Sequence, residues 1–128
     1  MNDNDKGITD ELINDILMNV KLMLPDKQVN DKLLILYIKM MCNNILVKTN
    51  RRIFIPELKY VVIDFVKDKF DVNTDDANLK SIMSMSEYDR SVNFGITEVL
   101  KNKLNLIAQK QLQDNESLIN KYKLLYRT

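Results

Sequence analysis

The hydrophobic positions in the first half of the chain recur every three or four residues, the spacing that places side chains on one face of a helix. The first run follows Thr9, and its apolar members are Leu12, Ile13, Ile16, Leu17, Val20 and Leu24. Thr9 suits the N-cap position, and the acidic pair Asp10 and Glu11 suits the first turn, where the helix dipole favours anions. We therefore predict a helix over residues 10–24, with residues 1–8 disordered before it.

The next two runs predict a second and a third helix. The second begins at Asn30 or Asp31, continues to about Thr49, and carries Leu33, Leu34, Leu36, Tyr37, Met40, Met41 and Ile45. Because it is apolar nearly all round, it must be surrounded by protein, either from its own fold or from neighbouring subunits. The third starts at Pro56, a favoured first helical residue. Its apolar stripe closes at Phe70 and consists of Leu58, Val61, Val62, Phe65 and Val66.

The pattern changes in the segment KSIMSMSEYDRSVNFG, residues 80–95. A polar loop over residues 71–78 precedes it, and apolar residues then alternate with serine or asparagine on both sides of the polar turn EYDR. Period-two alternation around a turn predicts a β-hairpin. After it, Thr97 caps a fourth helix that runs through Leu112. The sequence DNES then interrupts the helix before a last helical piece, LINKYKLLYR.

Together these elements predict one domain over residues 1–128. It is mainly α, a small helical bundle with one β-hairpin and a C-terminal helical tail over residues 114–128. An isolated hairpin is marginal in water, so this one must lie on the helices or pair with another chain; the pattern leaves both open. For pairing between subunits, the candidate interface residues are Ile82, Met83, Met85, Tyr88, Val92 and Phe94.

Composition removes most catalytic chemistry from consideration. The chain has no histidine, the commonest general base and a frequent metal ligand. Its one cysteine, Cys42, cannot build a zinc site or an intramolecular disulfide, and two glycines are too few for a phosphate-binding loop. The remaining enzyme or calcium hypothesis rests on the loop carboxylates Asp71, Asp75 and Asp76, but such loops are usually only solvated. We expect no enzyme, no cofactor and no metal.

The charge balance bears on partners. Nineteen basic against eighteen acidic side chains give a net charge of +1, too small an excess for a tight grip on nucleic acid. A small helical DNA-binding regulator remains an alternative, with Lys48, Arg51 and Arg52 touching phosphates from the end of the second helix. The same cations suit the negative end of the helix dipole, the interpretation we favour. We also expect no signal segment and no membrane span, because the longest apolar run, LLILYI, is far too short.

The order of these motifs resembles the head–tail connector (adaptor) proteins of long-tailed bacteriophages, above all those from phages of Gram-positive hosts. The resemblance depends on TNRR after the second helix, the helix LKYVVIDFV that follows Pro56, the serine-rich hairpin, and the aromatic-basic segment KYKLLYR. It spans most of the chain, from Thr9 to Arg127. One departure is the stretch over residues 96–113, which is longer than the family pattern between hairpin and tail.

The resemblance implies a structural virion protein of the head–tail interface, assembled in the host cytoplasm. Such proteins form a ring, dodecameric in the virion, below the portal protein. The ring extends the channel through which double-stranded DNA passes non-specifically, and it docks a stopper or tail-completion protein. The resemblance assigns the portal contact to Tyr122, Leu125, Tyr126 and Arg127. From the residues alone, Tyr122 and Leu125 equally suit packing of the last helix onto the core. A second hypothesis is another neck component, a stopper or tail-completion protein.

Overall fold

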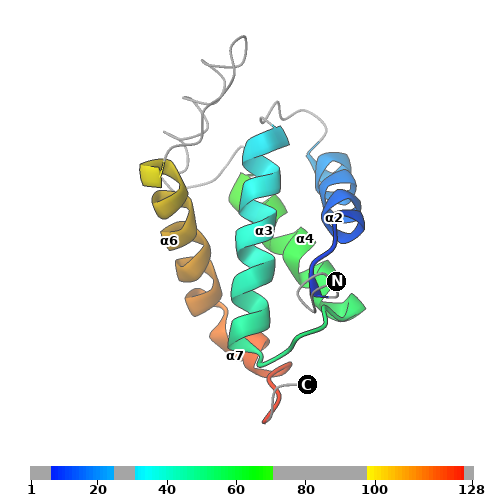
Figure 1. The fold of residues 1–128 in the computed structure, drawn as a ribbon, viewed down its shortest axis with the longest axis vertical. Helices are drawn as coiled ribbons and strands as arrows, with labels where there is room; N and C mark the ends of the chain where they lie inside the picture. Colours follow the sequence, from blue (N-terminus) through cyan, green and yellow to red (C-terminus); the bar gives the residue numbers. More distant parts are fainter. Residues whose placement is uncertain (1–6, 25–30, 71–97, 126–128) are drawn as a thin grey trace.

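The computed structural model describes residues 7–24, 31–70 and 98–125, which form a bundle of helices (Figure 1). In chain order these are α2 (Asp10–Met23), α3 (Asp31–Lys48), α4 (Pro56–Phe70), α6 (Glu98–Asp114) and α7 (Glu116–Asn120). Helix α3 occupies the middle and packs against the other four, while α2 also packs against α4. The described ranges contain no strand, and the predicted helical bundle is confirmed. The predicted hairpin, with its six candidate interface residues, lies outside the described residues.

Local sequence signals set the helix starts. Thr9 is extended, and its side-chain oxygen accepts a hydrogen bond from the Leu12 backbone N–H at 3.1 Å, as an N-cap should. Helix α4 begins at Pro56, whose missing N–H costs nothing in the first turn. The first three predicted helices are therefore confirmed, with ends that differ by one residue at most. The predicted cap of the fourth, Thr97, lies outside the described residues.

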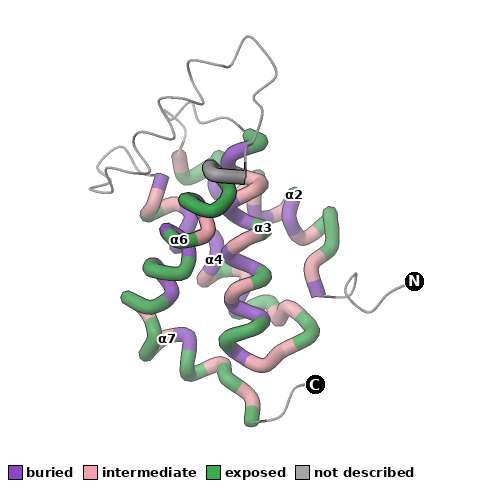
Figure 2. Tube along the Cα trace, turned by 60° about the vertical axis from the view of Figure 1, so that its left-hand side comes forward, coloured by how far each residue is buried: buried purple, intermediate pink, exposed green. Residues whose placement is uncertain are grey.

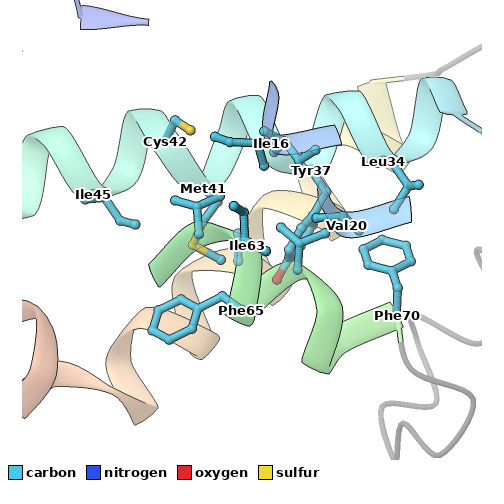
Figure 3. Close-up of a cluster of buried hydrophobic side chains, with 14 of the residues drawn as sticks. Ile16, Val20, Leu34, Tyr37, Met41, Cys42, Ile45, Ile63, Phe65 and Phe70 are labelled. Atoms are coloured by element: carbon cyan, nitrogen blue, oxygen red, sulfur yellow. The ribbon is translucent and has the colours of Figure 1, made fainter. Parts of the chain in front are cut away.

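Hydrophobic burial along one face of each helix holds the bundle together (Figure 2). Helix α3 contributes most to it, with Leu33, Leu34, Tyr37, Ile38, Met41, Cys42, Ile45 and Leu46 buried. In Figure 3, α2 meets α3 through Ile16 and Val20, and α4 meets it through Ile63. Each such side chain contributes about 1.5–3 kcal/mol when fully buried. Helices of the same chain cover the apolar face of α3, but Lys39, Asn43 and Val47 on α3 are exposed, so the prediction that the second helix is surrounded is confirmed only in part.

The single thiol belongs to this core. Cys42 is fully buried on α3, and burial raises the pKa of its thiol to about 12. Only the thiolate is a good nucleophile. Cys42 is therefore a packing residue that stays protonated and unreactive while the bundle is closed.

A buried chain of polar groups crosses the core between three helices. The Tyr37 hydroxyl on α3 donates to Gln111 Oε1 on α6 at 2.8 Å, and Gln111 Nε2 donates to the Phe65 carbonyl oxygen on α4 at 2.8 Å. The Tyr37 ring also meets the Phe70 ring edge-on, with centroids 5.4 Å apart. Buried polar groups need such partners because an unmet one is costly. These two buried hydrogen bonds therefore select one register of α6 against α3 and α4.

The C-terminal region departs from the prediction in one respect. The break at DNES is confirmed, since Asn115 separates α6 from α7 and its amide Nδ2 donates to the Gln111 carbonyl oxygen at 2.8 Å. The last helical piece, however, ends at Asn120, so the prediction of a helical tail is wrong for residues 121–125. The reason is that the Leu124 N–H donates to the Thr49 carbonyl oxygen at 2.9 Å, outside its own helix.

The start of the described chain is also more ordered than predicted. Gly7 is buried and Ile8 packs against the core, whereas both fall in the segment expected to be disordered. A Cβ atom at Gly7 would lie 2.5 Å from the Arg52 carbonyl oxygen and 3.2 Å from Leu46 Cδ1. The absence of a side chain is what lets the backbone pass so close to the end of α3. Residues 1–6 lie outside the described residues.

Candidate functional site

The end of α3 and the segment after α7 form the most specific polar arrangement on the surface. Helix α3 ends with the Asn50 N–H bonded to the Val47 carbonyl oxygen at 3.3 Å and the Arg51 N–H bonded to the Leu46 carbonyl oxygen at 3.0 Å. Asn50 has a φ of 57°, in the left-handed region. These are the bonds of a Schellman motif, in which asparagine replaces the more usual glycine.

Residues 121–125, which we call the tail, are attached to this helix end. The Leu124 N–H donates to the Thr49 carbonyl oxygen at 2.9 Å, and Asn50 Nδ2 donates to the Leu124 carbonyl oxygen at 3.0 Å. Arg51 Nε donates to the Tyr122 carbonyl oxygen at 2.8 Å. We call this set of three hydrogen bonds the tail junction. It holds the tail backbone against the end of α3.

The tail junction unites two motifs that the sequence places more than 70 positions apart, TNRR and KYKLLYR. Tyr122 is half-buried and packs against the core, as the packing interpretation expects. Leu125 is 93% exposed, so it contributes nothing to that core. Tyr126 and Arg127 lie outside the described residues. Of the four residues assigned to a portal contact, Leu125 is thus the one that the described structure leaves free for a partner.

The three cations near the end of α3 have different environments. Arg51 donates a hydrogen bond to the Tyr122 carbonyl oxygen of the tail, whereas Lys48 and Arg52 are exposed. Lys48 lines a polar cavity of about 270 Å³ together with Lys123 of the tail and Glu116 of α7. The tail junction therefore brings Lys123 to the same cavity as Lys48, and the Glu116 carboxylate also lines this cavity.

A second surface feature is a groove of about 610 Å³ between α2 and the start of α4. Its apolar lining residues are Leu12, Met18, Phe54, Ile55 and Pro56, and its polar lining residues are Thr9, Glu11, Asn14, Asp15 and Lys59. Asp15 and Lys59 bridge the groove with a 2.7 Å ion pair, and this hydrogen bond raises the pKa of Lys59. Glu11, in the first turn of α2, is exposed at its rim.

Sequence reasoning missed Asn50 and the groove for different reasons. An asparagine just after a helical run is a known substitute for a C-terminal glycine, so TNRR did contain a usable signal. The groove has none, because Met18 belongs to one helix and Phe54 to a link 36 positions later. The loop carboxylates considered for an enzyme or calcium site, Asp71, Asp75 and Asp76, lie outside the described residues.

Metal sites and membrane-spanning helices are two other features that the described residues could contain. These residues hold no group of three or more His, Cys, Asp or Glu side chains close enough to share a metal ion. None of their helices combines the length and apolar character that crossing a bilayer requires.

Comparison of the chain with protein-family models, with curated proteins and with solved structures gives no match. The tail junction and the groove are therefore the two candidate functional sites of the described residues.

Proposed function

We propose that this chain is a structural protein of a bacteriophage neck, a head–tail connector (adaptor) that forms a ring below the portal. In this proposal the ring extends the DNA channel and docks a stopper or tail-completion protein. The observation on which it depends is the tail junction, which ties a basic, aromatic segment to a rigid helix end and leaves Leu125 exposed. A docking element on a rigid support loses little entropy on binding.

Two further features support the proposal. The sequence order of TNRR, the Pro56 helix and the basic tail resembles the connector family, and the tail junction supplies a physical reason for two of these motifs to occur together. All the regular secondary structure of the described residues is helix. This favours an adaptor over a stopper, since stoppers are richer in strand. The predicted hairpin remains part of the proposal as the contact between subunits.

The test is electron microscopy of the purified protein, alone and mixed with the portal protein encoded in the same genome. The proposal expects added ring density below the portal. Leu125→Ser should weaken the apparent affinity for the portal about tenfold, because truncating an apolar anchor at an interface costs about 1–2 kcal/mol. Leu106→Ser is the matched control, since Leu106 is also largely exposed but lies on α6. Portals that stay bare in every mixture would contradict the proposal.

A small DNA-binding regulator is the second candidate, favoured by the shared cavity of Lys48 and Lys123. It predicts duplex binding that weakens steeply with salt, by roughly one unit of log–log slope per phosphate contact. Replacing both lysines by glutamine should then lower that slope by about two. The connector proposal expects no measurable duplex affinity at physiological salt.

A further inference from the structure

The groove between α2 and the start of α4 is an apolar surface that the described helices leave open. Met18, on its α2 wall, is 66% exposed, and Leu22, one turn further along α2, is 77% exposed. Ile53, which precedes the groove residue Phe54 in the link, is 58% exposed. Exposed apolar side chains are ordinary when scattered, but Met18 lines the recess, and Leu22 and Ile53 lie close in sequence to lining residues. Clustered apolar surface beside a recess is typical of a docking site.

The electrostatics of the groove restrict what can dock there. Its charged members are Glu11, Asp15 and Lys59, and since Lys59 is paired with Asp15, Glu11 leaves the rim net negative. An occupant should therefore combine an apolar side chain with positive charge and no nearby carboxylate. Complementary charge favours encounter and selects the partner.

The tail of this same chain has that chemistry. Lys121 and Lys123 are exposed on either side of the half-buried Tyr122, and Leu125 is 93% exposed. No acidic residue follows Glu116 in the sequence, so the segment is positive without interruption. Because Leu125 is so exposed, the copy's own tail does not seat this side chain in its own groove. A net charge of +1 also gives copies little mutual repulsion.

We propose that the α2–α4 groove binds the tail of a second copy of this chain, with Leu125 against Met18 and Phe54 and the tail lysines near Glu11. The contact joins two different surfaces and is therefore heterologous, so its repetition generates a closed ring or an open filament. The inference does not depend on the neck function, because both surfaces belong to the chain itself. It assigns Leu125 to a neighbouring copy, so this contact and the proposed portal contact compete for that side chain.

The probe is a synthetic peptide of residues 120–128, NKYKLLYRT, labelled for fluorescence anisotropy and titrated with the full chain. We expect saturable binding below about 1 mM that weakens as salt is raised. Met18→Ser and Glu11→Lys should each weaken it about tenfold, a change of about 1.4 kcal/mol. Val47→Ser is the control on α3, because Val47 is equally exposed but lies outside the groove. A peptide with Leu125→Ser should bind at least tenfold more weakly.

Two results would overturn the proposal. One is the absence of saturation with the wild-type chain. The other is a loss of peptide affinity that does not follow the groove. Affinity would then fall equally in Met18→Ser, Glu11→Lys and Val47→Ser, or it would fall in Asn50→Gly instead, which would place the peptide at the tail junction. Light scattering of the full chain gives an independent measurement: the average mass should rise with concentration in wild type and in Val47→Ser, and should stay that of a monomer in Glu11→Lys. No portal is present, so failure here leaves the connector proposal to its own test.

Discussion

The two flanks of the central helix α3 are held in different ways. On one flank, α6 meets α3 and α4 through the buried chain from Tyr37 to Gln111 to the Phe65 carbonyl. On the other, α2 meets α4 through the solvent-accessible pair of Lys59 and Asp15 and leaves a groove beside it. Within the described residues, one flank is thus specified by buried hydrogen bonds and the other carries an exposed ion pair beside a groove.

The contrast follows from where the polar groups lie. A buried hydrogen bond is strong because the surroundings have a low dielectric, and losing one partner leaves the other costly. An exposed ion pair competes with water and salt and contributes little. Substitutions of the exposed polar residues on the α2 flank should therefore have small effects on stability, whereas substitutions in the buried hydrogen bonds of the α6 flank should have large ones.

The largest effect is expected for Gln111→Leu. It keeps the size of the side chain but removes the acceptor of the Tyr37 hydroxyl and the donor to the Phe65 carbonyl, so the free energy of unfolding should fall by about 2 kcal/mol. Urea denaturation measures it. Gln113→Leu, the same substitution at an exposed position of α6, should stay within about 0.5 kcal/mol of wild type. Equal effects at both positions would mean that the buried chain does not specify the α6 flank.

An intermediate effect is expected at the tail junction. Asn50→Gly keeps the left-handed helix end, which glycine adopts freely, but removes the bond to the Leu124 carbonyl. The free energy of unfolding should change by about 1 kcal/mol or less, while trypsin cleavage after Lys123 should accelerate several-fold, because the tail must detach to be cut. Mass spectrometry of the product ending at Lys123 measures this rate.

The junction also offers a matched pair of arginines. Arg51→Met removes the bond to the Tyr122 carbonyl and should accelerate the same cleavage, whereas Arg52→Met, at an exposed neighbour, should not. A tail that is cut equally fast in both variants would show that its hydrogen bonds to α3 do not hold it.

The smallest effect is expected for Lys59→Met on the α2 flank. The hydrogen bond that Lys59 donates to Asp15 raises the pKa of Lys59 above its ordinary value of 10.5. The pair therefore stabilises the folded chain below that pH and loses its effect as pH rises through the folded-state pKa. The melting temperatures of wild type and variant should therefore differ slightly near pH 8 and converge above about pH 10.5. Lys39→Met, an exposed lysine on α3, should show no such convergence.

Apolar periodicity, capping residues and helix-starting or helix-breaking residues were sufficient to predict α2, α3 and α4. Each of these signals depends on contacts within a few residues. Thr9 caps its own helix and Pro56 begins its own, so no distant group has to be known. The same holds for the break at DNES. The tail was predicted wrongly because KYKLLYR has helical composition but its Leu124 N–H is satisfied by Thr49, which the sequence places 75 positions away.

The sequence by itself determined the helices α2, α3 and α4 and which of their faces are apolar, since both depend on local sterics and spacing. The tertiary structure decided that Gln111 is a buried connector and Gln113 is not, that Asn50 holds the tail, and that Met18 and Phe54 share a groove. Each of these results depends on how separate helices approach one another, and the packing of the whole core sets that approach.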